Sequence, residues 1–142
     1  MSKILQNAAK ITEKGEISYL ISTHRHDFVQ YKFKNGYIIN YDGGKDYFKR
    51  GFGGPDLEPG DKIEDYSLTE ESYFEKCCQK MIWGSRGKDG KGPLKYSPFA
   101  ELELDHLKAI LQYSSKLAVG LSEIQLKVIN YWIKEKTALK PN

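Results

Sequence analysis

The stretch DFVQYKFKNGYIINY, residues 27–41, decides the fold. Its two arms, Asp27–Phe33 and Tyr37–Tyr41, are rich in β-branched and aromatic residues, which favour strands. The pair Asn35-Gly36 between them is the strongest short-range signal for a hairpin, because both residue types tolerate the positive φ that primed turns require. The sequence therefore predicts an antiparallel hairpin with a primed turn at Asn35-Gly36.

Two segments that precede this hairpin are also predicted to be strands. Ile17–Ser22 has the same β-branched and aromatic character, and Lys14-Gly15 suggests a turn that follows a first strand over Ile4–Thr12. After the hairpin, Gly51–Lys62 is dense in glycine and proline and is expected to be a connection. We therefore expect an N-terminal antiparallel β-sheet of three or four strands.

Three helices are predicted in the second half of the chain. The first is expected to begin near Ser67, because Ser67 and Glu70 have the spacing of a capping box. Apolar residues then recur with a helical period as far as about Ile82, and Gly84 is expected to stop the helix.

The other two helices are predicted over about 100–117 and 123–138, where apolar residues again follow a helical period. Ser122 and Gln125 have the spacing that caps the last helix. Because the strands precede the helices rather than alternate with them, the predicted fold class is α+β.

Length and composition predict the class of protein. The chain has 142 residues, and we expect a single domain over 1–142, with a β-rich part over 1–52 and a helical part over 66–140. No run of about 18 apolar residues is present, and the N-terminus lacks the apolar core of a secretory signal, so we expect a cytoplasmic location without membrane contact. A formal net charge of +3 is too small to indicate binding to duplex nucleic acid.

The two cysteines and the distribution of charge give two further expectations. Cys77 and Cys78 are adjacent, so a disulfide between them would be strained, and buried thiols are expected. The segment Asp56–Glu75 contains eight acidic residues and one basic residue, whereas Lys76–Tyr96 contains six basic residues and one acidic residue, Asp89. The acidic run is interpreted as a solvated face or as a surface for a basic protein partner.

The stretch THRHDF, residues 23–28, is the first candidate site. On an extended segment His24 and His26 would project to the same side, a spacing that metal sites and histidine-pair phosphodiester chemistry both use. The supply of further metal ligands is poor, because the remaining histidine, His106, lies in an expected helix. Two other interpretations stay open: hydrogen bonding of the histidines within a strand or turn, and ligand contact by Arg25 or a histidine.

The second candidate site is the segment YDGGKDYFKRG, residues 41–51. The stretch Asp42–Gly44 permits a tight turn whose amides can point together, and Lys45, Lys49 and Arg50 are near enough in sequence to supply positive charge. This combination suits a phosphate group. The alternative is a strand end followed by a short helical turn with solvated cations.

The third candidate site is the loop WGSRGKDGKGPLKY, residues 83–96. Its glycines let backbone N–H groups approach a ligand, its cations can bind phosphate oxygens, and its aromatic rings offer surfaces on which a purine can stack. The alternative is a surface loop anchored to the core by its apolar residues. The candidate ligand contacts in this loop are Trp83, Arg86, Lys88, Lys91 and Tyr96.

The order of these motifs resembles a family of small uncharacterised proteins of tailed bacteriophages. THRHDF, DGGKDYFKRG and WGSRGKDGKGPLKY resemble the HxHDFV, DGGxDYxRR and GKDGKxPLK patterns of that family, with Lys49 in place of the first arginine of the second pattern, and the likeness covers about Ile17–Leu111. Relatives carry paired cysteines around the first motif, as in a small zinc ribbon, whereas this chain has Tyr31 and Phe33 there. The resemblance therefore implies a viral origin and expression inside a bacterium, and no metal site is expected.

The implied viral origin, together with the cations, glycine amides and aromatic rings of the motifs, suggests a function. Small phage proteins outside the virion frequently disarm host immunity, and some sequester cyclic-nucleotide or ADP-ribose-derived signals without cleaving them. We therefore expect a non-catalytic binding protein, without a cofactor, that sequesters a compact nucleotide-like anion, and we expect a symmetric homo-oligomer. The predicted ligand-binding residues are His24, Arg25, His26, Asp42, Lys49, Arg50, Trp83, Arg86, Lys88, Lys91 and Tyr96.

Two alternative functions stay open. The chain could be a phosphodiesterase that depends on His24 and His26, or an inhibitor that binds a host protein directly. Recovery of an intact nucleotide from the protein would favour sequestration, and product formation would favour hydrolysis. A stable complex with a host protein that ignores nucleotides would favour the inhibitor.

Overall fold

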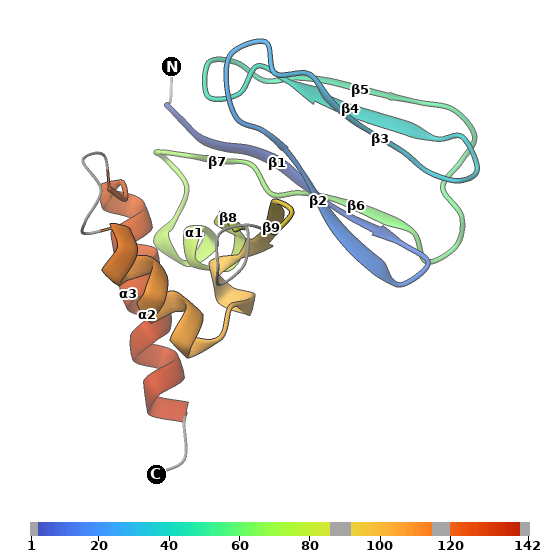
Figure 1. Ribbon diagram of the computed structural model, residues 1–142. Coiled ribbons are helices and arrows are strands. Elements are labelled where there is room, and N and C mark those ends of the chain that lie inside the picture. Colours follow the sequence, from blue (N-terminus) through green and yellow to red (C-terminus); the bar gives the residue numbers. More distant parts are fainter. Residues whose placement is uncertain (1–2, 86–91, 115–119, 140–142) are drawn as a thin grey trace. The chain divides into compact units, whose positions relative to one another are not determined.

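The computed structural model describes residues 3–85, 92–114 and 120–139 (Figure 1). Strands dominate the first half and helices the second, so the predicted α+β class is confirmed. The chain divides into two compact units, Met1–Ser72 (unit 1) and Tyr73–Asn142 (unit 2).

Unit 1 consists of two small antiparallel sheets (Figure 1). One has the strand order β2-β1-β6, with β7 also pairing with β1, and the other has the order β3-β4-β5. The predicted N-terminal sheet is therefore confirmed. The strands are β1 (Ile4–Glu13), β2 (Glu16–Ser22), β3 (Val29–Lys32), β4 (Ile38–Asp42), β5 (Lys49–Gly53), β6 (Lys62–Asp65) and β7 (Leu68–Thr69).

The predicted hairpin at Asn35-Gly36 is confirmed, but the prediction that its turn is a primed turn is wrong. Strands β3 and β4 pair antiparallel, and Gly36 has a φ of 102°, whereas Asn35 does not adopt a positive φ. The N–H of Gly36 donates to the carbonyl of Phe33 at 2.9 Å, which closes a three-residue loop in which only the last residue needs a positive φ. The Asn35 amide instead donates to the carbonyl of Asp56 at 2.7 Å.

The primed turn lies at Lys14-Gly15. Glu13 pairs with Glu16 across β1 and β2, so only two residues connect the strands. Lys14 and Gly15 have φ values of 50° and 82°, as such a turn requires. The length of the loop therefore decides which turn forms, and a lysine accepts the left-handed conformation here.

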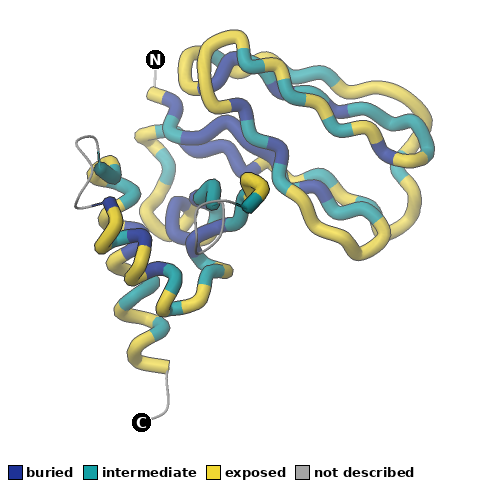
Figure 2. The backbone as a smooth tube through the Cα atoms, viewed as in Figure 1, coloured by how far each residue is buried: buried dark blue, intermediate teal, exposed yellow. Residues whose placement is uncertain are grey.

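The core of unit 1 contains residues of both sheets, and Figure 2 shows buried stretches in each of them. Buried positions alternate along β4, where Ile39 and Tyr41 face inward between half-buried neighbours. This period of two is that of strands with one buried face. The buried cluster comprises Ala9, Ile11, Leu20, Phe33, Ile39 and Tyr41.

Two predictions at the end of unit 1 are wrong. The stretch predicted as a connection, Gly51–Lys62, contributes Gly51–Gly53 to β5, and its last residue begins β6. Ser67 does not cap a helix, because the chain continues into β7 and the Ser67 hydroxyl accepts a hydrogen bond from the N–H of Ala8 at 3.1 Å. Strand pairing with β1 thus overrides the local capping signal.

Unit 2 contains three α-helices and two short strands among its described residues. The first helix is shorter than predicted, and the strands β8 and β9, which pair antiparallel, were not predicted. Gly84 lies in β8, where an added Cβ would come within 2.9 Å of the Tyr96 ring, so close strand packing accounts for this glycine. The elements are α1 (Phe74–Lys80), β8 (Ile82–Ser85), β9 (Lys95–Pro98), a 3₁₀ turn (Phe99–Glu101), α2 (Leu104–Ser114) and α3 (Glu123–Leu139).

The helices of unit 2 agree with two further predictions. Ser122 and Gln125 exchange hydrogen bonds of 2.9 and 3.3 Å, so the predicted cap of the last helix is confirmed. Cys77 and Cys78 are buried thiols, and burial raises the pKa of Cys78 to about 11. The helix predicted over 100–117 begins later, at Leu104, and residues 115–117 lie outside the described residues.

Candidate functional site

The first candidate site is a turn cluster in unit 1, formed by Thr23–Phe28 and Asp42–Lys49. The prediction that His24 and His26 lie on an extended segment is wrong, because the chain turns there. The N–H of Asp27 donates to the carbonyl of His24 at 3.0 Å, and His26 has a φ of 64°. This left-handed conformation is uncommon for a residue other than glycine, and such outliers gather at functional sites.

Asp27 holds the first turn closed. One oxygen of its carboxylate accepts hydrogen bonds from the N–H of Thr23 at 2.8 Å and from the Thr23 hydroxyl at 3.2 Å. The same oxygen lies 3.8 Å from Nδ1 of His24, whose side chain is 75% exposed. Asp27 is thus a local brace, and the histidine ring beside it stays open to solvent.

The second turn packs directly against the first. Gly43 and Gly44 both have a positive φ, and an added Cβ at Gly44 would lie 2.3 Å from the backbone carbonyl of His24. The Ser22 hydroxyl accepts from the N–H of Gly44 at 2.9 Å and donates to the carbonyl of Asp27 at 2.6 Å. One buried hydroxyl therefore joins the two turns.

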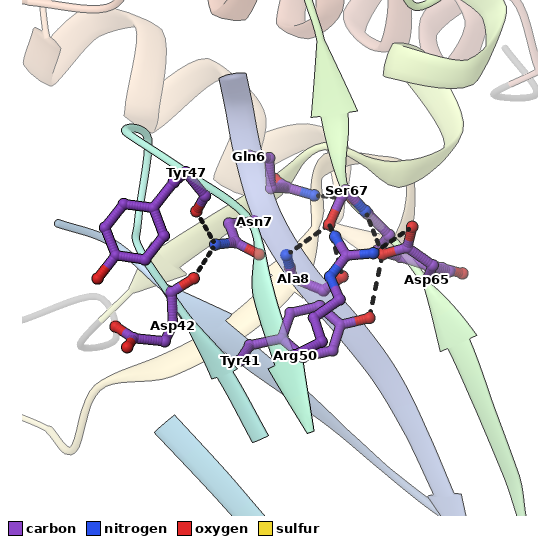
Figure 3. A network of polar contacts seen from close by, with 10 residues as sticks. Gln6, Asn7, Ala8, Tyr41, Asp42, Tyr47, Arg50, Asp65 and Ser67 are labelled. Atoms are coloured by element: carbon purple, nitrogen blue, oxygen red, sulfur yellow. Dashed lines mark hydrogen bonds and ion pairs between the residues drawn. The ribbon is translucent and has the colours of Figure 1, made fainter. Parts of the chain in front are cut away.

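Asn7 anchors the second turn from the neighbouring strand β1 (Figure 3). It lies in β1 with only 1% of its surface exposed, and its amide nitrogen contacts the carbonyls of Asp42 and Gly44 at 3.1 Å and of Tyr47 at 3.4 Å. Its own carbonyl oxygen has no hydrogen-bond partner among the described residues. Sequence reasoning missed Asn7, although a polar pair, Gln6-Asn7, inside a strand is a signal of a buried polar role.

Three side chains meet on the outer side of the two turns. Nδ1 of His26 lies 2.7 Å from the hydroxyl of Tyr47. Partial burial, followed by the negative charge of Asp42 and a hydrogen bond to its carboxylate, raises the pKa of Tyr47, while the charge of Arg25 acts in the opposite direction. Figure 3 shows the Tyr47 hydroxyl and the Asp42 carboxylate on the same side of Asn7.

Lys49 and Arg50 lie next to each other in β5 but differ in their contacts. Lys49 pairs with Asp42 across the sheet and is exposed, so it borders the turn cluster. Arg50 contacts other parts of unit 1: its NH2 group donates to the Ser67 hydroxyl at 2.7 Å, and its NH1 group lies 3.4 Å from the carboxylate of Asp65. The turn cluster therefore includes five of the predicted ligand-binding residues: His24, Arg25, His26, Asp42 and Lys49.

The second candidate site is a cavity in unit 2 with a volume of about 580 Å³. Trp83, Pro93 and Leu102 supply apolar wall, and Gly92 also lines the cavity. The Trp83 ring packs against the buried ring of Phe99, with centroids 5.6 Å apart. The cavity thus has one fixed aromatic wall.

Polar side chains complete the cavity wall. Ser85 and His106 both line it, and the Ser85 hydroxyl lies 3.5 Å from Nε2 of His106. The further polar residues lining the cavity are Lys95, Ser97, Glu101 and Glu103. Sequence reasoning missed Ser97, His106 and both glutamates, because they lie outside the motif of residues 83–96, and it assigned no role to Ser85 within that motif.

The other predicted residues of the third site divide into two groups. Tyr96 packs over Gly84 from the neighbouring strand. Arg86, Lys88 and Lys91 lie outside the described residues.

Among the described residues, no three His, Cys, Asp or Glu side chains are grouped as a metal ion would require. No helix in the described part of the chain is long and apolar enough to cross a membrane. The comparisons found no family model, no curated protein and no solved structure that matches this chain.

Proposed function

We propose that unit 2 binds a compact, nucleotide-derived anion in its cavity and sequesters it without cleaving it. The observation that carries this proposal is the cavity itself, with Trp83 as its aromatic wall and hydrogen-bonding side chains around it. The phage-like motifs suggest that the ligand is an immune signal of a bacterial host, met in the host cytosol.

The size and the apolar wall of the cavity suit a nucleotide base. Ligand sites have volumes of roughly 300–1,000 Å³, and a cavity of about 580 Å³ falls inside that range. Trp83 is held by its contact with Phe99, so its free face is available without a further ordering cost. Stacking of a base on such a ring contributes about 1–3 kcal/mol.

The polar wall suits a ribose and a phosphate. Glu101 and Glu103 offer carboxylate oxygens, which accept hydrogen bonds from ribose hydroxyls in other nucleotide sites. Lys95 offers a positive charge to the phosphate. Arg86, Lys88 and Lys91 lie in sequence between two lining residues, and we include them on the basis of the sequence alone.

Titration calorimetry with cyclic nucleotides and ADP-ribose derivatives tests the proposal, followed by mass spectrometry of the ligand released on denaturation. At least one compound should bind and be recovered intact. Trp83→Ala should weaken binding about 5- to 150-fold, which corresponds to the loss of one stacked base. Lys95→Ala should also weaken binding, whereas the matched control Lys108→Ala, an exposed lysine in α2 outside the cavity wall, should not.

Failure of the whole panel to bind, or equal affinity of Trp83→Ala and the wild type, would refute the proposal. A chemically altered ligand would also contradict it, because sequestration leaves the ligand intact. The symmetric homo-oligomer remains a prediction, and light scattering with and without the bound nucleotide would test it.

A further inference from the structure

The turn cluster of unit 1 takes no part in the proposed function, yet much of unit 1 holds it in place. We propose that it is an acid–base site that cleaves the phosphodiester backbone of single-stranded RNA, with His26 as general base and His24 as general acid. This activity is independent of nucleotide binding in unit 2.

The rigid frame of the cluster is the first argument. His26 keeps a φ of 64°, a conformation that persists only where the surrounding structure enforces it. The enforcing contacts are the amide of Asn7, the bridging hydroxyl of Ser22, and the close approach of Gly44 to the backbone of His24. A frame of this kind fixes side chains within the narrow tolerance that catalysis needs.

The orientation of His26 is the second argument. The hydroxyl of Tyr47 lies 2.7 Å from Nδ1 of His26 and engages that nitrogen in a hydrogen bond. We assign the imidazole proton to Nδ1, which then donates to the phenol oxygen of Tyr47. In this tautomer Nε2, on an exposed ring, is the nitrogen that accepts a proton.

The setting of His24 is the third argument. Its Nδ1 lies 3.8 Å from the carboxylate of Asp27 and 3.2 Å from the hydroxyl of Thr23. A proton on Nδ1 therefore has partners within the turn, while a proton on Nε2 stays free to be donated to a leaving group. Arg25 lies between the two histidines in the sequence and is exposed, so its guanidinium is accessible to the phosphate.

The surroundings of the cluster indicate the class of substrate. The histidines stand on exposed turns, so a polymer backbone that passes over the surface can reach them. Phe28 and Phe48, which follow the two turns, are 56% and 42% exposed and can stack on unpaired bases. Lys49 adds positive charge at the border. Exposed aromatic and basic residues together favour a single strand over a duplex.

The reaction needs no group beyond these side chains and the RNA. Nε2 of His26 takes the proton of a ribose 2′-hydroxyl, and the oxygen attacks the adjacent phosphorus. The bond from phosphorus to the 5′-oxygen of the next nucleotide breaks, and that oxygen takes the proton of Nε2 of His24. The products are a 2′,3′-cyclic phosphate and a free 5′-hydroxyl, and solvent restores the two protonation states.

A single-stranded RNA oligonucleotide with a fluorophore and a quencher tests the activity, and the all-deoxy oligonucleotide of the same sequence is the substrate control. Wild-type protein should cleave the RNA to a 2′,3′-cyclic phosphate, identified by mass spectrometry, and should leave the DNA intact. His26→Ala and His24→Ala should each lose roughly 100- to 10,000-fold in rate. Lys108→Ala, which changes an exposed residue of unit 2 outside the cavity wall, should keep the rate, and loss of cleavage in the identically purified histidine variants excludes a co-purified nuclease.

Two more variants separate chemistry from binding. Tyr47 is a positioning residue, so Tyr47→Phe should lower kcat about 10- to 100-fold, the effect of losing one hydrogen bond to a group that becomes charged, and should leave KM unchanged. Phe28→Ala should raise KM and leave kcat unchanged. Amide hydrogen exchange of β2 and β3 confirms that each variant keeps its fold.

Absence of RNA cleavage by the wild type, equal cleavage by His26→Ala, or cleavage of the DNA would overturn the proposal. None of these results bears on nucleotide binding in unit 2, which calorimetry measures separately. The two proposals can therefore fail independently.

Discussion

Replacement of Arg50 is expected to destabilise unit 1, because its guanidinium is held between two rings and two polar groups. The guanidinium carbon lies 4.5 Å from the centroid of the Tyr41 ring and 4.6 Å from that of Phe48. Each cation–π contact contributes about 0.5–1 kcal/mol, and the hydrogen bond to the Ser67 hydroxyl about 1 kcal/mol. The partly exposed ion pair with Asp65 adds less than about 1 kcal/mol.

Arg50→Ala should therefore lower the free energy of unfolding of unit 1 by about 3 kcal/mol. Arg50→Lys keeps the charge but loses the planar fork, and should cost about 1–2 kcal/mol. The matched control is Lys49→Ala, which removes the neighbouring exposed cation and should change the free energy by less than about 0.5 kcal/mol.

The measurement must report on unit 1. Both tryptophans, Trp83 and Trp132, lie in unit 2, so tryptophan fluorescence would report on unit 2. Amide hydrogen exchange of β4 and β5 measures the opening of unit 1 directly. A loss below about 1 kcal/mol in Arg50→Ala, or a lysine variant as stable as the wild type, would refute the assignment of Arg50 to the fold.

Two further predictions concern strain and pH. Gly44→Ala should destabilise unit 1 by more than about 2 kcal/mol in urea unfolding, because the new Cβ would clash with the backbone carbonyl of His24. Gly15→Ala is the control: its new Cβ has no atom within 4 Å, so it should cost only the strain of the left-handed conformation, about 1–2 kcal/mol. Equal losses in the two variants would contradict this reasoning. The phenol of Tyr31 donates to Glu13 at 2.6 Å, which together with burial raises the pKa of Tyr31 to about 12, so this stabilisation is complete below pH 10 and is lost as the pH rises toward about 12. Hydrogen bonds from Tyr31 and from the backbone of Lys34 lower the pKa of Glu13, so the stability of unit 1 should also fall as the pH drops below 4.5, the usual pKa of a glutamate. Both pH dependences of stability should shrink in Tyr31→Phe. Unchanged profiles would refute the coupling between Tyr31 and Glu13.

Much of the fold follows from local patterns in the sequence. The β-branched and aromatic residues of Ile17–Ser22 and of the hairpin arms, which are separated by turn formers, predict β2, β3 and β4. The last helix follows from its period and from the cap formed by Ser122 and Gln125. These elements agree because their local propensity and their tertiary contacts favour the same conformation.

The wrong predictions share a physical cause. Ser67 and Glu70 have a sound capping spacing, but the hydroxyl of Ser67 binds the N–H of Ala8, which is 59 residues away, and this pairing places the segment in a sheet. Gly84 was predicted to stop a helix, yet it lies inside β8 where the Tyr96 ring packs over it. A partner distant in the sequence can override a local signal worth about 1 kcal/mol.

In the candidate sites, too, local motifs were visible in the sequence, whereas contacts between distant residues were not. The motif around His24 and His26 is visible in the sequence, but its partner Tyr47 is 21 residues away from His26 and carries no local signal. The cavity in unit 2 is similar, because Ser85 and His106 meet across 21 residues and come from a strand and a helix. No spacing rule relates residues that only the folded chain brings together.

By itself, the sequence determined the α+β class, the first four of the nine strands in the described residues, and the last helix, because residue type, hydrophobic period and turn chemistry act over a few neighbouring residues. The tertiary structure alone decided that Asn7 supports the turns, that Tyr47 orients His26, and that Arg50 belongs to the fold of unit 1. These roles depend on hydrogen bonds and ring contacts across strands, whose energy exists only once the two sheets have packed.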